Sequence, residues 1–127
     1  MDERDSLFSK IQDLLASTGP VHIWINNTGG PPPGLLLSAT EEDILLAIGR
    51  HVLSSQRILP LLIPGMEEAS YGRIINILSI SVRTPIPNLG VSNLTRAAMA
   101  AWAKTLSQEL PPKITMNSIL PGYTATE

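Results

Sequence analysis

Three stretches of the chain carry apolar residues at the three- and four-residue spacing that is typical of one helix face. Thr40 and Asp43 have the spacing of a capping box, with acidic residues in the first turn that follows. Asp5 or Ser6 is expected to cap the first helix. The predicted helices cover residues 5–17, 41–63 and 91–110.

Pro60 lies inside the second of these predicted helices. Proline has no backbone N–H and its ring clashes with the preceding turn, so Pro60 is expected to kink this helix or to end its regular part. Residues 64–68, which read Pro-Gly-Met-Glu-Glu, are then expected to connect the helix to the next element.

Two short runs rich in Ile lie between the predicted helices, and a third run, Thr-Met-Asn-Ser-Ile-Leu, follows the last of them. Each run has the length and the β-branched content of a strand and is bounded by Gly, Pro, Asn or Ser. Helices that alternate with single strands are typical of an α/β fold with a parallel sheet and right-handed crossovers. The predicted strands cover residues 21–25, 73–78 and 115–120.

Small and polar residues follow all three predicted strands. In a parallel sheet the carboxyl ends of the strands meet at one edge, which is where ligands bind in open α/β folds. Glycines at that edge allow a ligand to approach the backbone. Turn chemistry alone explains each cluster, but three in succession favour a site. The clusters are Asn26, Asn27, Gly29 and Gly30; Ser79 and Ser81; and Pro121, Gly122, Thr124 and Thr126.

The composition excludes several classes of function. The 127 residues carry a net charge of −2 with scattered basic residues, so no nucleic-acid partner is expected. The chain has no cysteine and two histidines in different predicted elements, so no metal site is expected. No apolar run reaches the roughly 20 residues of a membrane span, and the acidic N-terminus lacks an apolar signal region. We therefore expect no membrane partner and a cytoplasmic location.

The three strand ends resemble motifs of one family, the short-chain dehydrogenases/reductases. Residues 26–29, Asn-Asn-Thr-Gly, are similar to its Asn-Asn-Ala-Gly motif after the fourth strand. Residues 72–79 resemble its fifth strand with the catalytic serine, here Ser79, at the end. Pro121-Gly122 followed by Thr126 resembles its Pro-Gly-x-x-x-Thr segment after the sixth strand.

This resemblance covers nearly the whole chain and implies a partial Rossmann-like, three-layer α/β fold. Residues 1–127 would form a single partial domain, equivalent to strands four to six and helices three to five of the family. The Gly-rich cofactor-binding half on the N-terminal side and the substrate lid on the C-terminal side would both be lacking. The sequence indeed contains no Gly-x-Gly-x-x-Gly motif.

The resemblance also implies catalytic positions, several of which have changed residue. With the usual spacing from Ser79, the family's tyrosine falls on Ser92 and its lysine on Arg96. The assisting asparagine of the fourth helix is replaced by His51. Another register, which needs a three-residue deletion, places Leu89 and Asn93 at the tyrosine and lysine positions. The chain's tyrosines, Tyr71 and Tyr123, are not followed by lysine four residues later.

These replacements change the chemistry that the resemblance implies. In the family, the tyrosine donates the proton and the lysine lowers the tyrosine pKa and holds the ribose. A serine hydroxyl such as that of Ser92 is a poor general acid, and Arg96 can hold ribose hydroxyls but keeps its proton. Ser79 can still polarise a carbonyl. The plainer alternatives are that Ser92 caps its helix, Ser79 is a loop serine and His51 is a packed helix residue.

By resemblance the cofactor is NAD or NADP and the function is hydride transfer between carbonyl and alcohol. The chain alone is expected to have little or no activity. The alternative is a non-catalytic remnant or dimerisation module, which would form a homo-oligomer or bind a full-length relative through helices 41–63 and 91–110. An uncovered first strand would itself invite association. The expected cofactor contacts are Asn26, Asn27, Gly29, Arg96, Pro121, Gly122, Thr124 and Thr126.

Overall fold

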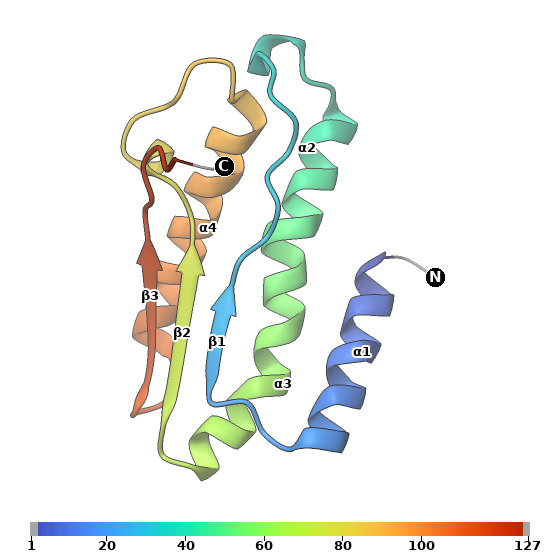
Figure 1. The fold of residues 1–127 in the computed structure, drawn as a ribbon, viewed down its shortest axis with the longest axis vertical. Helices are drawn as coiled ribbons and strands as arrows, with labels where there is room; N and C mark the ends of the chain where they lie inside the picture. Colours follow the sequence, from blue (N-terminus) through green and yellow to red (C-terminus); the bar gives the residue numbers. More distant parts are fainter. Residues whose placement is uncertain (1–2, 126–127) are drawn as a thin grey trace.

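The computed structural model describes residues 3–125 and contains a three-stranded parallel sheet with helices on one of its faces (Figure 1). The predicted order of helices and strands is confirmed, and the strand bounds agree within two residues. The helices are α1 (Glu3–Thr18), α2 (Glu41–Ile48), α3 (Ser54–Glu68) and α4 (Gly90–Glu109), and the strands are β1 (Ile23–Asn26), β2 (Gly72–Ile77) and β3 (Ile114–Ile119).

The sheet has the order β1-β2-β3, and both pairs of neighbouring strands are parallel. In register, Ile25 lies beside Ile75, and Ile75 beside Asn117. The carboxyl ends of all three strands therefore lie at the same edge of the sheet, as predicted. Figure 1 shows this edge at the top, where the arrowheads point.

The hydrophobic core lies between the sheet and the helices α3 and α4. Each fully buried aliphatic side chain there stabilises the fold by about 1.5–3 kcal/mol, since its apolar surface is removed from water. The buried core residues are Ile58, Leu59, Leu62 and Met66 of α3, Ile74 of β2, Ala103 of α4, and Ile114 and Met116 of β3.

The opposite face of the sheet is bare. Ile23 and Ile25 are 55% and 61% exposed, and Ile119 is 50% exposed. The register places Ile75 and Ile77, both half-buried, on the same face. The described residues thus supply two layers of the expected three-layer fold, the sheet and the helices on one side.

The second predicted helix is longer than expected, and Pro60 does not end it. The helix continues through Pro60 and Pro64 to Glu68, so residues 64–68 belong to α3 and are not a connection. Pro60 is exposed, so its ring faces solvent, while Leu59, Leu62 and Met66 hold the other side of the helix in the core. The tertiary packing therefore outweighs the local penalty of about 3 kcal/mol for a proline in a helix.

A π-helical turn, Gly49–Leu53, joins α2 to α3 and contains His51. The Ser54 hydroxyl donates a hydrogen bond to the Gly49 carbonyl, five residues back, at 3.0 Å. A π-turn adds one residue to the helical turn and so changes the direction in which the following side chains point. Such turns occur frequently at functional sites.

The predicted cap of α2 is confirmed, and the predicted cap of α1 was wrong. At α2, the Thr40 hydroxyl accepts from the Asp43 N–H at 3.1 Å, and the Asp43 carboxylate accepts from the Thr40 N–H at 2.9 Å. The Asp43 carboxylate also accepts from the Thr40 hydroxyl at 2.8 Å, and the backbone and side-chain donors of Thr40 together hold the pKa of Asp43 below its usual value. Asp5 and Ser6 already lie inside α1, so neither caps it, and Asp5 instead pairs with Arg57 of α3.

Candidate active site

Arg96 ties the ends of β1 and β2 together. It lies in the second turn of α4 and is half-buried. Its Nη1 donates to the carbonyl of Ile77, the last residue of β2, at 3.2 Å, and its Nη2 donates to the Thr28 carbonyl after β1 at 3.3 Å. Burial lowers the pKa of the guanidinium, but arginine keeps its charge in proteins. A positive charge therefore sits at the predicted edge.

Backbone hydrogen bonds join the ends of β2 and β3. The Leu78 N–H donates to the Ile119 carbonyl at 2.9 Å, and the Ile80 N–H donates to the Pro121 carbonyl at 3.1 Å. Ser79 lies between these two bonds and is half-buried. Its Oγ accepts from the Ser81 N–H at 3.1 Å. That contact uses an acceptor lone pair, so the Ser79 hydroxyl hydrogen can be donated to a ligand.

Ser92 lies in the first turn of α4, one turn before Arg96. The alternative reading of Ser92 as a helix cap is wrong, because Leu89 occupies the cap position and makes no side-chain capping bond. Ser92 is half-buried and shares a helix face with Arg96 through their four-residue spacing. The side chain of Asn93, from the alternative register, instead bonds the backbone of Ile86.

His51 is buried beneath the loop that follows β1, with 1% of its surface exposed. Its Nδ1 lies 2.6 Å from the Thr28 hydroxyl. Burial and the nearby Arg96 charge lower the pKa of His51 to about 4, while a hydrogen bond to the Gly29 backbone opposes the shift and the Arg50 charge adds to it. His51 is therefore neutral at pH 7 and holds the loop through hydrogen bonds.

Asn26 lies below the edge and has a structural position. It is 8% exposed, and its Nδ2 donates to the Ser55 hydroxyl and to Asn76 Oδ1, both at 2.9 Å. Both amide hydrogens are therefore used to join β1 to β2 and α3. Asn76 and Ser55 were missed by sequence reasoning, although a polar residue inside the apolar run of β2 was a usable signal. The Nδ2 of Asn76 is buried without a partner among the described residues.

The remaining predicted contact residues surround the edge more loosely. Asn27 and Gly29 are exposed after β1. Pro121 is half-buried, and Gly122 and Thr124 are exposed after β3. Thr126 lies outside the described residues. A Cβ added to Gly29 would meet no atom within 4 Å, so a ligand has open access to the backbone there.

Neither tyrosine has the sequence position that the motif spacing gives to the proton donor. Tyr71 precedes β2, at the opposite end of that strand from Ser79, and its ring stacks on Arg73 at 4.4 Å. Tyr123 follows β3 and is 89% exposed. The proton-donor position that the motif spacing indicates is therefore held by Ser92.

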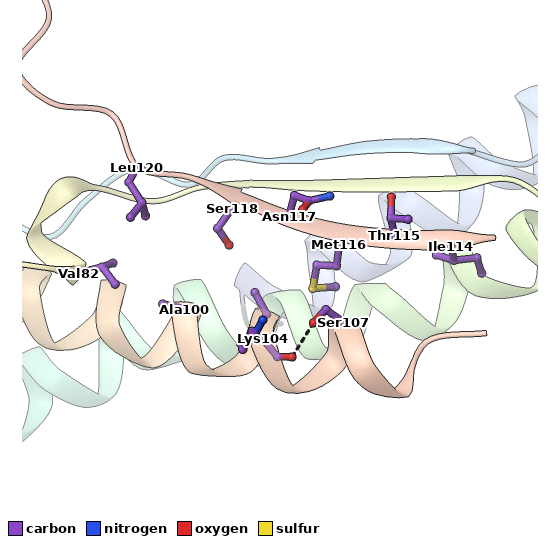
Figure 2. Close-up of a pocket in the computed structure, with 11 residues that line it drawn as sticks. Val82, Ala100, Lys104, Ser107, Ile114, Thr115, Met116, Asn117, Ser118 and Leu120 are labelled. Atoms are coloured by element: carbon purple, nitrogen blue, oxygen red, sulfur yellow. Dashed lines mark hydrogen bonds between the residues drawn. The ribbon is translucent and has the colours of Figure 1, made fainter. Parts of the chain in front are cut away.

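Cavities flank the loop after β1, and a larger groove lies elsewhere. Cavities of about 400 Å³ and 340 Å³ both include Gly29 and Gly30 in their walls, and Arg50 lines both. A groove of about 480 Å³ runs between α4 and β3, where the small side chain of Ala100 leaves space opposite β3 (Figure 2). Figure 2 shows no cluster of ionisable side chains in this groove, so the chemistry points to the strand ends.

The part of the chain that the structure describes has neither a cluster of metal-binding side chains nor a membrane-spanning helix. In residues 3–125, no three His, Cys, Asp or Glu side chains gather as ligands of one metal ion. No helix within that range combines the length and the apolar character needed to cross a bilayer.

The parallel sheet with its polar carboxyl edge defines a Rossmann-like α/β fold. The sequence model of the short chain dehydrogenases matches residues 1–127. The chain therefore belongs to the short-chain dehydrogenase/reductase family, which the strand-end motifs had predicted.

Individual relatives are similar along the whole chain. The 3-oxoacyl-[acyl-carrier-protein] reductase MabA of Mycobacterium avium is 28% identical over 127 residues, which are 99% of this chain and 49% of MabA. The very-long-chain 3-oxoacyl-CoA reductase of Rattus norvegicus is 32% identical over 97% of this chain and 41% of its own length. L-sorbose reductase from Gluconobacter frateurii, solved with NADPH and L-sorbose, matches with a TM-score of 0.86 and 28% identity, over 94% of this chain and 46% of that one. The chain thus spans about half the length of its relatives.

Proposed function

We propose that this chain forms the nicotinamide-side half of an NAD(P)-dependent oxidoreductase site for carbonyl and alcohol substrates, with little or no activity alone. The observation that carries the proposal is the position of Arg96, which bridges the ends of β1 and β2. Ser79 follows at the end of β2. The NADPH in L-sorbose reductase, whose fold is the same over this chain, supports the choice of cofactor.

The donors at the edge suit a nicotinamide ribose. A guanidinium has five N–H donors, and the bonds to Thr28 and Ile77 use two of those of Arg96. The others, with the open backbone at Gly29, match ribose hydroxyls and a carboxamide. A bound nicotinamide supplies or accepts the hydride. The pyrophosphate fits less well, since the sequence has no Gly-x-Gly-x-x-Gly turn to hold it.

The low activity follows from the proton donor. Ser79 can polarise a substrate carbonyl by donating its hydroxyl hydrogen, which is a role in orientation and electrostatics. Ser92 stands where the family has tyrosine, and a serine hydroxyl is far less acidic than a phenol. Arg96 keeps its proton. The residues at this edge therefore bind and orient a carbonyl better than they protonate it.

Titration of the 127-residue chain with NADH and NADPH, followed by nucleotide fluorescence, tests the proposal. We expect enhancement in the wild type and binding weaker by about tenfold or more in R96A, because a charge-assisted hydrogen bond is worth about 1.5–3 kcal/mol. R83A, which removes an exposed arginine after β2, is the matched control and should bind as the wild type does. No response of the wild type up to millimolar nucleotide, or equal binding by R96A and R83A, would refute the proposal.

The second candidate function is a module that associates through its helices with another copy or with a longer relative. It is favoured by an exposed leucine surface on the second helical segment. Leu45, Leu46 and Leu53 are 61%, 51% and 46% exposed. Single exposed leucines are common on protein surfaces, whereas a cluster of them marks an interface.

Sedimentation equilibrium separates this helix surface from the bare sheet face. L45D and I25D each place a charge at a residue that is 61% exposed, one on α2 and one on β1. If the helices pair, L45D weakens a discrete dimer and I25D leaves it intact. If association is instead the irregular pairing of an uncovered sheet, I25D reduces it and L45D has no effect, which would count against the module.

A further inference from the structure

Three residues that depart from the family pattern contact one another in the structure. Thr28 replaces the alanine of Asn-Asn-Ala-Gly, His51 stands at the asparagine position, and Arg96 stands at the lysine position. The Thr28 side chain contacts His51 at 2.6 Å, and the Thr28 carbonyl accepts from Arg96 at 3.3 Å. They come from the β1 loop, the π-turn and α4, which are far apart in sequence.

We propose that Thr28 and His51 are positioning residues for Arg96, and that the three side chains act as one unit which orients the guanidinium at the sheet edge. The positioning role goes beyond the proposed function. Only its expected effect on nucleotide binding rests on that function. The contact between His51 and Thr28 fixes the loop after β1, and the Thr28 carbonyl in that loop holds the Arg96 guanidinium.

Thr28 is the link, because its side chain and its carbonyl have different partners. Its hydroxyl is bonded to His51, which restricts rotation of this residue and so fixes the direction of its carbonyl. That carbonyl accepts a hydrogen bond from Nη2 of Arg96, and the Ile77 carbonyl accepts one from Nη1. A planar guanidinium held on both terminal nitrogens has one orientation, whereas a lysine ammonium in its place would act as a point charge.

His51 is itself anchored well enough to serve as a support. It lies in the π-turn Gly49–Leu53, and its backbone carbonyl accepts from the Ser55 hydroxyl at 2.6 Å. Ser55 in turn accepts from Asn26 of β1 at 2.9 Å. The ring therefore sits on a chain of hydrogen bonds that runs into the sheet, and its 1% exposure shields the contact with Thr28 from water.

The charged groups around His51 allow the coupling to be measured without any nucleotide. Arg96 and Arg50 both disfavour its protonated form, and Asp43 lines the cavity that His51 also lines. Arg50 pairs with Glu3 at 3.3 Å. Arg50 thus acts on the same ring by charge and is held by a different partner, which makes it a matched control for Arg96.

The test is a mutant cycle read by NMR titration of the His51 imidazole in the 127-residue chain, with the signal assigned by H51N. R96A should raise the His51 pKa, since it removes a nearby positive charge. The rise should be smaller in a T28V background, where Arg96 has lost its oriented carbonyl, than in a T28S background, which keeps the hydroxyl. R50A should raise the pKa equally in both backgrounds.

Equal effects of R96A in the T28V and T28S backgrounds would overturn the proposal, and so would an R50A effect that depends on Thr28 in the same way. Circular dichroism and denaturant midpoints of T28V and T28S show that the comparison is made between folded chains. If T28V does not fold, T28A takes its place, since alanine is the residue of the family motif at this position.

A second set of measurements compares NADPH binding by the same variants. If the wild type binds NADPH, T28V and H51Q should each weaken binding about threefold to tenfold, the range for loss of one hydrogen bond, and T28V should have no further effect when added to R96A. If the wild type binds no nucleotide, the proposed function fails while the His51 cycle still decides the positioning role. Additive losses of T28V and R96A would contradict the single unit.

Discussion

Gly90→Ala is expected to lower the free energy of unfolding by about 3 kcal/mol or more, a large part of the stability of a small domain. A Cβ at Gly90 would lie 2.4 Å from the backbone N and 2.6 Å from the Cα of Leu36. Backbone atoms cannot rotate away as a side chain can, so the loop and α4 must separate. The reason is close approach, because the φ of Gly90 is not in the left-handed region.

The same variant is expected to disturb the candidate site. Gly90 donates its N–H to the Gly34 carbonyl at 3.0 Å, and Gly34 donates to the Asn88 carbonyl at 2.7 Å. These bonds fasten the loop after β1 to the start of α4. Because Thr28 is on that loop and Arg96 is on that helix, separation of the two lengthens the Thr28–Arg96 contact.

Urea denaturation of Gly90→Ala beside Gly34→Ala measures this effect. Gly34 belongs to the same bridge, but a Cβ there meets no atom within 4 Å, so Gly34→Ala should change the unfolding free energy by less than about 1 kcal/mol. If the two variants are equally stable, the approach of Leu36 to α4 is not tight and the bridge does not hold the loop in place.

The sequence predicted those elements whose formation depends on residues close together in the chain. The capping box at Thr40 was readable because its hydrogen bonds span three residues of one segment. The three strands were readable from runs of β-branched residues, and the parallel order placed Asn27, Ser79 and Gly122 at one edge. The family motifs then assigned candidate roles at that edge, which remain predictions for the individual side chains.

Features that depend on packing between distant segments were missed. Pro60 is tolerated because the opposite side of its helix is buried, which no local rule reports. The π-turn around His51 has no distinctive residue pattern, and the role of the His51 side chain becomes visible only from its contact with Thr28 in the folded chain. The contacts of Asn26 with Ser55 and Asn76 join residues 29 and 50 positions apart. Sequence reasoning placed Asn26 with the ligand contacts, whereas its amide hydrogens are spent inside the fold.

His51 is also expected to make stability depend on pH. Its pKa is about 4 in the folded chain, against an ordinary value of about 6.5, chiefly because burial disfavours the charged ring. Between these two values the unfolded chain binds more protons than the folded chain. Stability therefore falls as the pH is lowered from 6.5 to 4, and the contribution of His51 to this loss is complete below pH 4.

The expected loss is on the order of 2 kcal/mol, since each pKa unit corresponds to about 1.4 kcal/mol and the neighbouring cavity allows some hydration of the charged ring. Unfolding free energies from urea titrations at pH 7 and pH 4.5 measure it. H51N is the matched control, because an amide can retain the bond to Thr28 and does not titrate in this range. Its stability should fall less over the same interval, and the carboxylates common to both proteins account for what remains.

The pH dependence and the positioning of Arg96 have one physical origin. Protonation of His51 would place a third positive charge beside Arg96 and Arg50, and this charge repels the Arg96 guanidinium. The same event that destabilises the fold should therefore weaken the contact between Arg96 and the Thr28 carbonyl. If wild type and H51N lose stability equally between pH 7 and pH 4.5, His51 is hydrated in the folded state and is not the buried support that the geometry describes.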